Sequence, residues 1–106
     1  MTENEISLFK DKVVELIALL INLQNTSDIN TNNGWRVVKI AIFFITGDRE
    51  EAALITSDLM KQKSFTGLTF TVNTNIKVDY TGVVVETLDK YLKAQEANNE
   101  ILKRIA

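Results

Sequence analysis

The turn Thr46-Gly47-Asp48 is the first place in this 106-residue chain where residue types and spacing suggest chemistry. A turn that follows a strand and opens a helix often binds phosphate groups. Here the glycine-rich pattern is missing, and Asp48, Glu50 and Glu51 would repel an anion. We expect Asp48 to be a helix N-cap, with Glu51 three residues later completing a capping box. The alternative is a weak Mg²⁺ site on Asp48, Glu51 and Asp79, because hard cations prefer carboxylate oxygens.

A second group of side chains suits recognition rather than catalysis. It combines one aromatic ring, two cations and two amides, namely Trp35, Arg36, Lys39, Asn32 and Asn33. These residues are candidates for binding a ligand or a partner, since an exposed aromatic residue can anchor a partner. The alternative is that Trp35 seals the end of the core and that the cations protect a sheet edge from unwanted pairing. Asp28 and Asp79 dilute the positive charge, so nucleic-acid binding is not expected.

The composition excludes several kinds of site. The chain has no cysteine and no histidine, which rules out disulfides and thiolate chemistry and removes the commonest general base and zinc ligand. Serine and threonine nucleophiles need an activating base, and no constellation of Lys, Asp and Glu suggests one. We therefore expect no catalytic residue and no cofactor, which favours a protein that is not an enzyme.

Length and charge indicate one domain, residues 1–106, that works in the cytoplasm. A chain of this length has room for a single core. The formal charge of -2 argues against a dedicated nucleic-acid binder. The most apolar run, Val13 to Leu23, is interrupted by Glu15 and Asn22 and is shorter than the roughly 20 residues of a membrane span. The first residues are acidic, where a secretory signal would be basic.

The first predicted element is a helix over residues 3–24. Steps of three and four residues place one set of apolar side chains on a single face: Ile6, Phe9, Val13, Ile17, Leu20 and Ile21. The second half is apolar nearly all round, through Val14, Leu16, Ala18, Leu19 and Leu23. Such a helix is normally buried on more than one side. It lies either in a homo-oligomer interface or at the centre of its own chain.

A loop and a strand are predicted next. Residues 25–34 are rich in Asn, Asp, Ser and Thr, which favour turns. Trp35 to Ile45 is predicted as a core strand with two apolar faces, because Lys39 is the one polar residue on the second face. Strands of this kind lie centrally in a covered sheet. We expect Phe43 and Ile45, on that second face, to be covered by the first helix or by another copy of the chain.

The rest of the chain completes the predicted order α-β-α-β-β-α. A helix runs from the cap at Asp48 to about Lys63, and residues 68–80 alternate as a hairpin or one long strand. A last helix is expected from about Val83 to Ile105, although Val83 to Val85 are β-branched and could be strand. Residues 96–106 could project as a helical tail.

This order predicts an α+β domain with a small, mostly antiparallel three-stranded sheet packed with helices. The central β-α-β-β-α order resembles an incomplete ferredoxin-like split unit, in element order alone, with an extra N-terminal helix. The expected function is that of a small intracellular protein that binds other proteins as a homo-oligomer, as an adaptor, an inhibitor or an immunity-type partner. The alternative is a regulator that binds a small molecule or nucleotide in a pocket between subunits. A third possibility is an enzyme with a carboxylate-bound metal.

Overall fold

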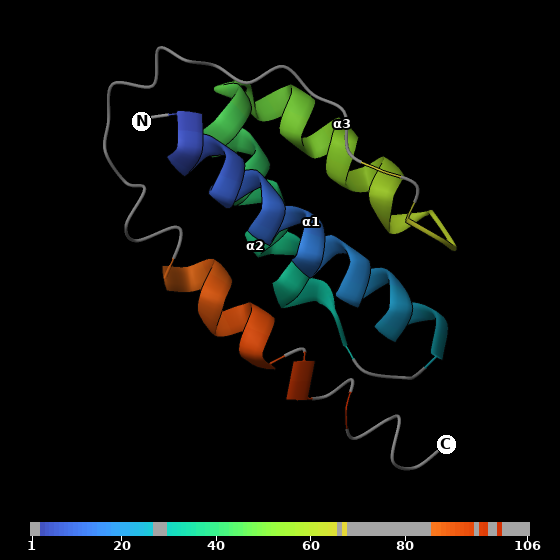
Figure 1. Ribbon diagram of the computed structural model, residues 1–106. Helices are drawn as coiled ribbons and strands as arrows, with labels where there is room; N and C mark the ends of the chain where they lie inside the picture. Colours follow the sequence, from blue (N-terminus) through green and yellow to red (C-terminus); the bar gives the residue numbers. More distant parts are fainter. Residues whose placement is uncertain are drawn as a thin grey trace.

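Helices make up the described part of the molecule, which is a computed structural model that describes residues 3–26, 30–65, 67, 86–94, 96–97 and 100. The labelled helices are α1 (Glu3–Thr26), α2 (Asn32–Thr46) and α3 (Arg49–Met60), and a further helical segment covers residues 86–94. Figure 1 shows α3 and the 86–94 segment on opposite sides of the pair formed by α1 and α2. No helix within these ranges has the length and apolar character needed to cross a membrane.

The prediction of an α+β fold is wrong. Of the described residues, 86% are helical and none lies in a strand. Trp35 to Ile45, predicted as the core strand, forms most of α2. The likeness to a ferredoxin-like split unit therefore fails at its first strand. The predicted hairpin or strand at 68–80 lies outside the described residues, as do Val83 to Val85 and residues 101–106.

The burial pattern along α2 explains why this stretch is a helix. Trp35, Val38, Ile42 and Ile45 are all buried, and their spacing of three, four and three residues places them on one helical face. β-Branched and aromatic residues favour strands, but their cost in a helix is at most about 0.7 kcal/mol each. Burying one such side chain contributes about 1.5–3 kcal/mol. Packing against α1 therefore outweighs the local preference.

Exposure also contradicts the two faces that a strand would have. In a strand, Val37, Lys39, Ala41 and Phe43 would share one face. In the structure Val37 and Ala41 are buried, whereas Lys39 and Phe43 are exposed. The second apolar face that seemed to need a cover does not exist as a face.

Gly47 ends α2. It has φ 72°, in the left-handed region, and its N–H donates to the carbonyl oxygen of Phe43 at 2.8 Å. Glycine adopts this conformation without the steric cost that other residues meet, which makes it the usual residue after a helix end. The chain can therefore reverse at once, and α3 begins two residues later as the antiparallel neighbour of α2.

Asp48 is the N-cap of α3, as predicted. Its Oδ1 accepts hydrogen bonds from the backbone N–H groups of Glu50 at 3.0 Å and Glu51 at 3.1 Å. The N–H of Asp48 itself donates to Oγ1 of Thr46 at 3.2 Å. Thr46 thus takes the place that the Glu51 carboxylate would have in a full capping box.

The core lies where α1 meets the other helices, and the predicted helix over residues 3–24 is confirmed with a slightly later end. Five of its predicted core residues are buried: Phe9, Val13, Ile17, Leu20 and Ile21. Leu16 and Leu23 are buried as well. The enclosed position of α1 within its own chain therefore accounts for the apolar circumference of its second half.

The start of α2 lies tight against α1. The predicted loop at 25–34 is shorter in the structure, because α1 extends to Thr26 and α2 begins at Asn32. A Cβ atom on Gly34 would lie 2.5 Å from Cδ2 of Leu20, which is fully buried. A larger residue at this position would require the Leu20 side chain to shift, so glycine allows the two helices to lie this close.

An ion pair between Lys12 and Asp89 joins α1 to the 86–94 segment. Beside it, the pKa of Glu15 is raised, first by a hydrogen bond with the Glu96 side chain and then by burial and by the charges of Glu96 and Asp89. The charge of Lys12 opposes these effects. At neutral pH the contact between α1 and this segment therefore combines one attraction with a repulsion between carboxylates.

Candidate binding groove between α2 and α3

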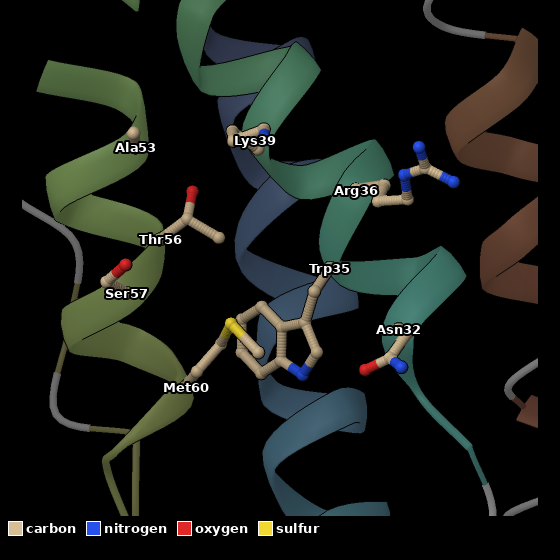
Figure 2. Close-up of a pocket in the computed structure, with 8 residues that line it drawn as sticks. All are labelled: Asn32, Trp35, Arg36, Lys39, Ala53, Thr56, Ser57 and Met60. Atoms are coloured by element: carbon tan, nitrogen blue, oxygen red, sulfur yellow. The ribbon is translucent and has the colours of Figure 1, made fainter. Parts of the chain in front are cut away.

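A groove runs along the surface shared by α2 and α3. Near the Gly47 turn it has a volume of about 480 Å³ and is lined by Lys39, Ile40, Phe43, Arg49, Ala52 and Ala53. Toward the other end it has a volume of about 280 Å³ (Figure 2), with a lining of Asn32, Trp35, Arg36, Lys39, Ala53, Thr56, Ser57 and Met60. Because Lys39 and Ala53 line both hollows, the two adjoin and form one groove.

Four of the five residues predicted to bind a ligand or partner lie together in this groove: Asn32, Trp35, Arg36 and Lys39. The fifth, Asn33, is exposed and does not line it. Positions 32, 36 and 39 come together because they lie about one helical turn apart. A strand would have spread the same residues along its length.

Sequence reasoning missed the wall that α3 contributes. Ala53, Ser57 and Met60 lie on one side of that helix, next to its buried residues. Their spacing of four and three residues is the sequence signal that places them together. That signal becomes informative only once α2 is known to be the neighbouring helix.

Trp35 forms the floor of the groove. Its side chain is 2% exposed, and its Nε1–H donates to Oε1 of Gln24 at 2.6 Å. The same oxygen accepts a bond from Oγ1 of Thr31 at 3.1 Å, and Nε2 of Gln24 donates to the carbonyl oxygen of Met60 at 3.4 Å. Figure 2 shows the Met60 side chain reaching from α3 toward the indole ring. Gln24, which no sequence pattern singled out, thus joins the start of α2 to the end of α3.

The sides of the groove carry large apolar side chains that are partly in contact with solvent. Ile40 is 54% exposed, Met60 42% and Phe43 37%. Between them α3 contributes the small side chains of Ala53 and Ser57. The groove therefore has large apolar side chains at both ends and small side chains on its α3 side in the middle.

Among the described residues, every charged side chain that lines the groove is a cation: Arg36, whose guanidinium points away from α3 (Figure 2), Lys39 and Arg49. The chain as a whole carries a formal charge of -2, so the local charge is opposite to the net charge. The guanidinium carbon of Arg49 lies 5.6 Å from the centre of the Phe43 ring, within the range of a cation–π interaction. None of these three cations has an ion-pair partner among the described residues.

The carboxylates considered for a metal do not gather in the described part of the chain. Within those ranges no group of three or more suitable side chains is close enough to hold an ion. One carboxylate oxygen of Asp48 is engaged in capping α3, and Asp79 lies outside the described residues. The described residues therefore give a metal site no geometric basis.

The residues predicted for an oligomer interface occupy three kinds of place. Leu16, Leu23 and Ile45 are buried within their own chain, and Val14 and Leu19 are half-buried on α1. Phe43 lies in the groove and is the most exposed of the six. The six residues therefore do not form one surface: Phe43 lies in the groove, and the exposed parts of Val14 and Leu19 lie on α1.

Comparison with known proteins found no family model that matches the chain, no matching curated protein and no matching solved structure.

Proposed function

We propose that this protein is a non-catalytic binding protein that holds a segment of another protein in the groove between α2 and α3. The observation that carries the proposal is an exposed apolar surface with cations beside it. Ile40 and Phe43 line one end of the groove with Lys39 and Arg49, and Met60 lines the other end with Lys39. Neither cation has an ion-pair partner among the described residues. Aromatic residues, methionine and arginine are enriched where proteins bind one another. An adaptor, an inhibitor and an immunity-type partner all work through such a surface.

The floor of the groove supports binding because it is held in place before a partner arrives. Trp35 is fixed by its hydrogen bond to Gln24, and Gln24 is fixed by its bonds to Thr31 and Met60. A site that is already formed loses less conformational entropy when it binds, so more of the contact energy appears as affinity.

Selection of binding peptides tests this proposal. A displayed library of random peptides, with no conformation imposed, is selected against the wild-type protein, and the selected peptides are then measured against Ile40→Glu. Ile40 is 54% exposed, so the substitution leaves the core intact. The matched control is Leu54→Glu, on a leucine that is 68% exposed and does not line the groove.

We expect selected peptides to bind the wild type and Leu54→Glu alike and to bind Ile40→Glu at least about tenfold more weakly, as for an interface residue whose loss costs over 1 kcal/mol. Circular dichroism checks that both variants keep the wild-type helix content. A selection in which no peptide distinguishes Ile40→Glu from Leu54→Glu would refute the proposed function.

A small anionic ligand is the second candidate. Around the Trp35 floor, Asn32, Arg36 and Lys39 line a space of about 280 Å³, and cations beside an aromatic surface suit a phosphate or carboxylate group. A thermal-shift screen with nucleotides and divalent metals tests this candidate, since a ligand of the folded state raises the melting temperature. A response to the metals alone would instead favour the carboxylate-metal enzyme.

We also propose that the protein is a homo-oligomer whose contact lies outside the groove. A two-fold contact through the groove would bring Lys39 and Arg49 toward their own copies and would be repulsive. Leu8 is an exposed apolar residue elsewhere on the surface. Light scattering that finds a monomer at micromolar concentration would refute the oligomer and leave the binding groove untouched. A cytoplasmic location is part of the proposal and is tested by fractionating the source cell.

A further inference from the structure

We infer that the partner segment is an acidic amphipathic helix, with apolar residues seven positions apart and Asp or Glu residues beside them. The inference rests on the proposed function and specifies the chemistry of the partner. Its basis is the charge, the length and the backbone chemistry of the groove.

The charge of the groove selects an acidic partner. Lys39 and Arg49 line it, and Arg36 lines it with its guanidinium pointing away from α3 (Figure 2). Among the described residues no carboxylate lines either hollow, and this includes Glu50 and Glu51 at the start of α3. Cations that have no ion-pair partner within the described residues attract carboxylates of a partner and repel a basic segment. A second copy of this chain would present the same three cations, so the groove is complementary to a different surface.

The length of the groove matches two turns of a helix. Its apolar ends are formed by Phe43 and Ile40 near the Gly47 turn and by Met60 over Trp35 at the other end. Trp35 and Phe43 are eight residues apart on α2, which is about 12 Å along the helix axis. Residues i and i+7 of a bound helix are about 10.5 Å apart on one face, so the two can reach the two apolar ends together.

The middle of the groove allows a helix to approach closely. Ala53 and Ser57 on α3 are small and exposed, so a third apolar residue of the partner, at i+3 or i+4, can enter between the ends. Packed helices lie about 8–10 Å apart, depending on the side chains between them. Small residues on one wall favour the short end of that range.

Backbone chemistry favours a helix over an extended segment. An extended peptide leaves its N–H and C=O groups in need of partners, and two helices offer no free edge of the kind that a sheet provides. A helix satisfies its own backbone and presents only side chains. The groove between α2 and α3 therefore fits a helix laid into it.

The test uses Trp35 as its reporter. It is the one tryptophan in the chain and forms the groove floor, so a peptide without tryptophan that enters the groove changes its fluorescence emission. The probe is an 18-residue peptide with leucine at i, i+4, i+7 and i+11, glutamate beside the leucines and alanine elsewhere. One control peptide has the same composition in an order without the helical spacing. The other has lysine in place of every glutamate.

We expect the glutamate peptide to bind with micromolar affinity and both control peptides to bind at least about tenfold more weakly, in line with the repulsion of like charges across an interface. Lys39→Glu should weaken the glutamate peptide about tenfold and strengthen the lysine peptide, since it removes one attraction and adds one repulsion. The matched variant Lys90→Glu, on an exposed lysine of the 86–94 segment, should change neither.

Three results would overturn the inference. The first is equal binding of the glutamate and lysine peptides, and the second is a change of emission that Lys39→Glu leaves unaltered. The third is a library selection that yields groove-dependent peptides without acidic residues, which would refute the acidic helix while the proposed function stands. A selection without any groove-dependent peptide would refute both.

Discussion

Replacing Gln24 by leucine tests whether one side chain holds the floor of the groove. Leucine is close to glutamine in size but cannot accept a hydrogen bond. The Trp35 side chain is 2% exposed, so its Nε1–H would stay buried without an acceptor, at a cost of about 1–3 kcal/mol. Thr31 and the Met60 carbonyl would lose one bond each, which adds about 1 kcal/mol because water can replace part of them. We expect Gln24→Leu to lower the free energy of unfolding by about 2–4 kcal/mol.

The assay is urea unfolding followed by far-ultraviolet circular dichroism, because the fluorescence of Trp35 changes with its own hydrogen bond. Gln24→Glu is the matched variant. It keeps an acceptor for Trp35 and Thr31 and loses the donor to Met60, so we expect a loss of about 1 kcal/mol or less. A double-mutant cycle with Trp35→Phe then isolates the bond between the two side chains.

The double-mutant cycle measures the coupling free energy between Gln24 and Trp35. Phenylalanine has no N–H, so in a Trp35→Phe chain the replacement Gln24→Leu no longer strands a buried donor. Its cost should therefore fall by about 1–3 kcal/mol, the cost of the buried donor. If the two substitutions were additive to within about 0.5 kcal/mol, the bond from the indole to Gln24 would not be what fixes the ring.

Three further predictions concern the helix contacts. Gly34→Ala should lower the free energy of unfolding by about 1 kcal/mol. Overpacking against Leu20 costs about 1–3 kcal/mol, and this exceeds the gain of about 1 kcal/mol from the helical preference of alanine. Urea unfolding that shows a more stable variant would contradict this prediction. Asp48→Ala should cost about 1 kcal/mol in the same assay and Asp48→Asn less. Equal losses would show that the negative charge at the helix start stabilises α3 and that the accepted hydrogen bonds do not. The raised pKa of Glu15, caused first by its bond with Glu96, means that its ionisation opposes folding, so stability falls as pH rises through that pKa. Glu15→Gln should match the wild type near about pH 3, where the carboxyl is protonated, and be more stable by about 0.5 kcal/mol at pH 7; a difference that stays constant with pH would refute the repulsion.

The first and third helices could be predicted because their sequence signals are local. The spacing of Val13, Ile17 and Leu20 fits one face of a helix, whereas in a strand the three would fall on both faces. Asp48 predicts the start of α3, because aspartate is preferred at the N-cap. These signals depend on neighbours within one or two turns, so they survive whatever the rest of the chain does.

The second helix could not be read in this way because a buried strand and a buried helix share the same composition. A run of apolar residues is ambiguous by periodicity alone and has to be judged by its length. Trp35 to Ile45 spans 11 residues and is followed by Gly47. That length exceeds the usual strand of about 5–6 residues, and the glycine suits a helix end as well as a strand turn.

The α2 residues of the groove could be predicted from residue type, whereas the α3 residues could be identified only from the fold. Asn32, Trp35, Arg36 and Lys39 were identified because aromatic, cationic and amide side chains suit recognition. Their gathering depends on α2 being a helix, and the wall from α3 depends on which helix lies beside it. Both are properties of tertiary packing that no local pattern carries.

The wrong prediction of a strand at Trp35 to Ile45 and the proposed binding site have one physical cause. A helix whose outer face serves only solvent would carry polar residues at positions 40 and 43, and its period of 3.6 would then be plain. These positions are occupied by Ile40 and Phe43, so the sequence of α2 is as apolar as that of a buried strand. Sequences break such local rules mainly where function requires it, and an apolar side chain left in water adds nothing to folding. Ile40 and Phe43, which obscure the helical period of the sequence, also line the wider end of the groove together with Lys39 and Arg49.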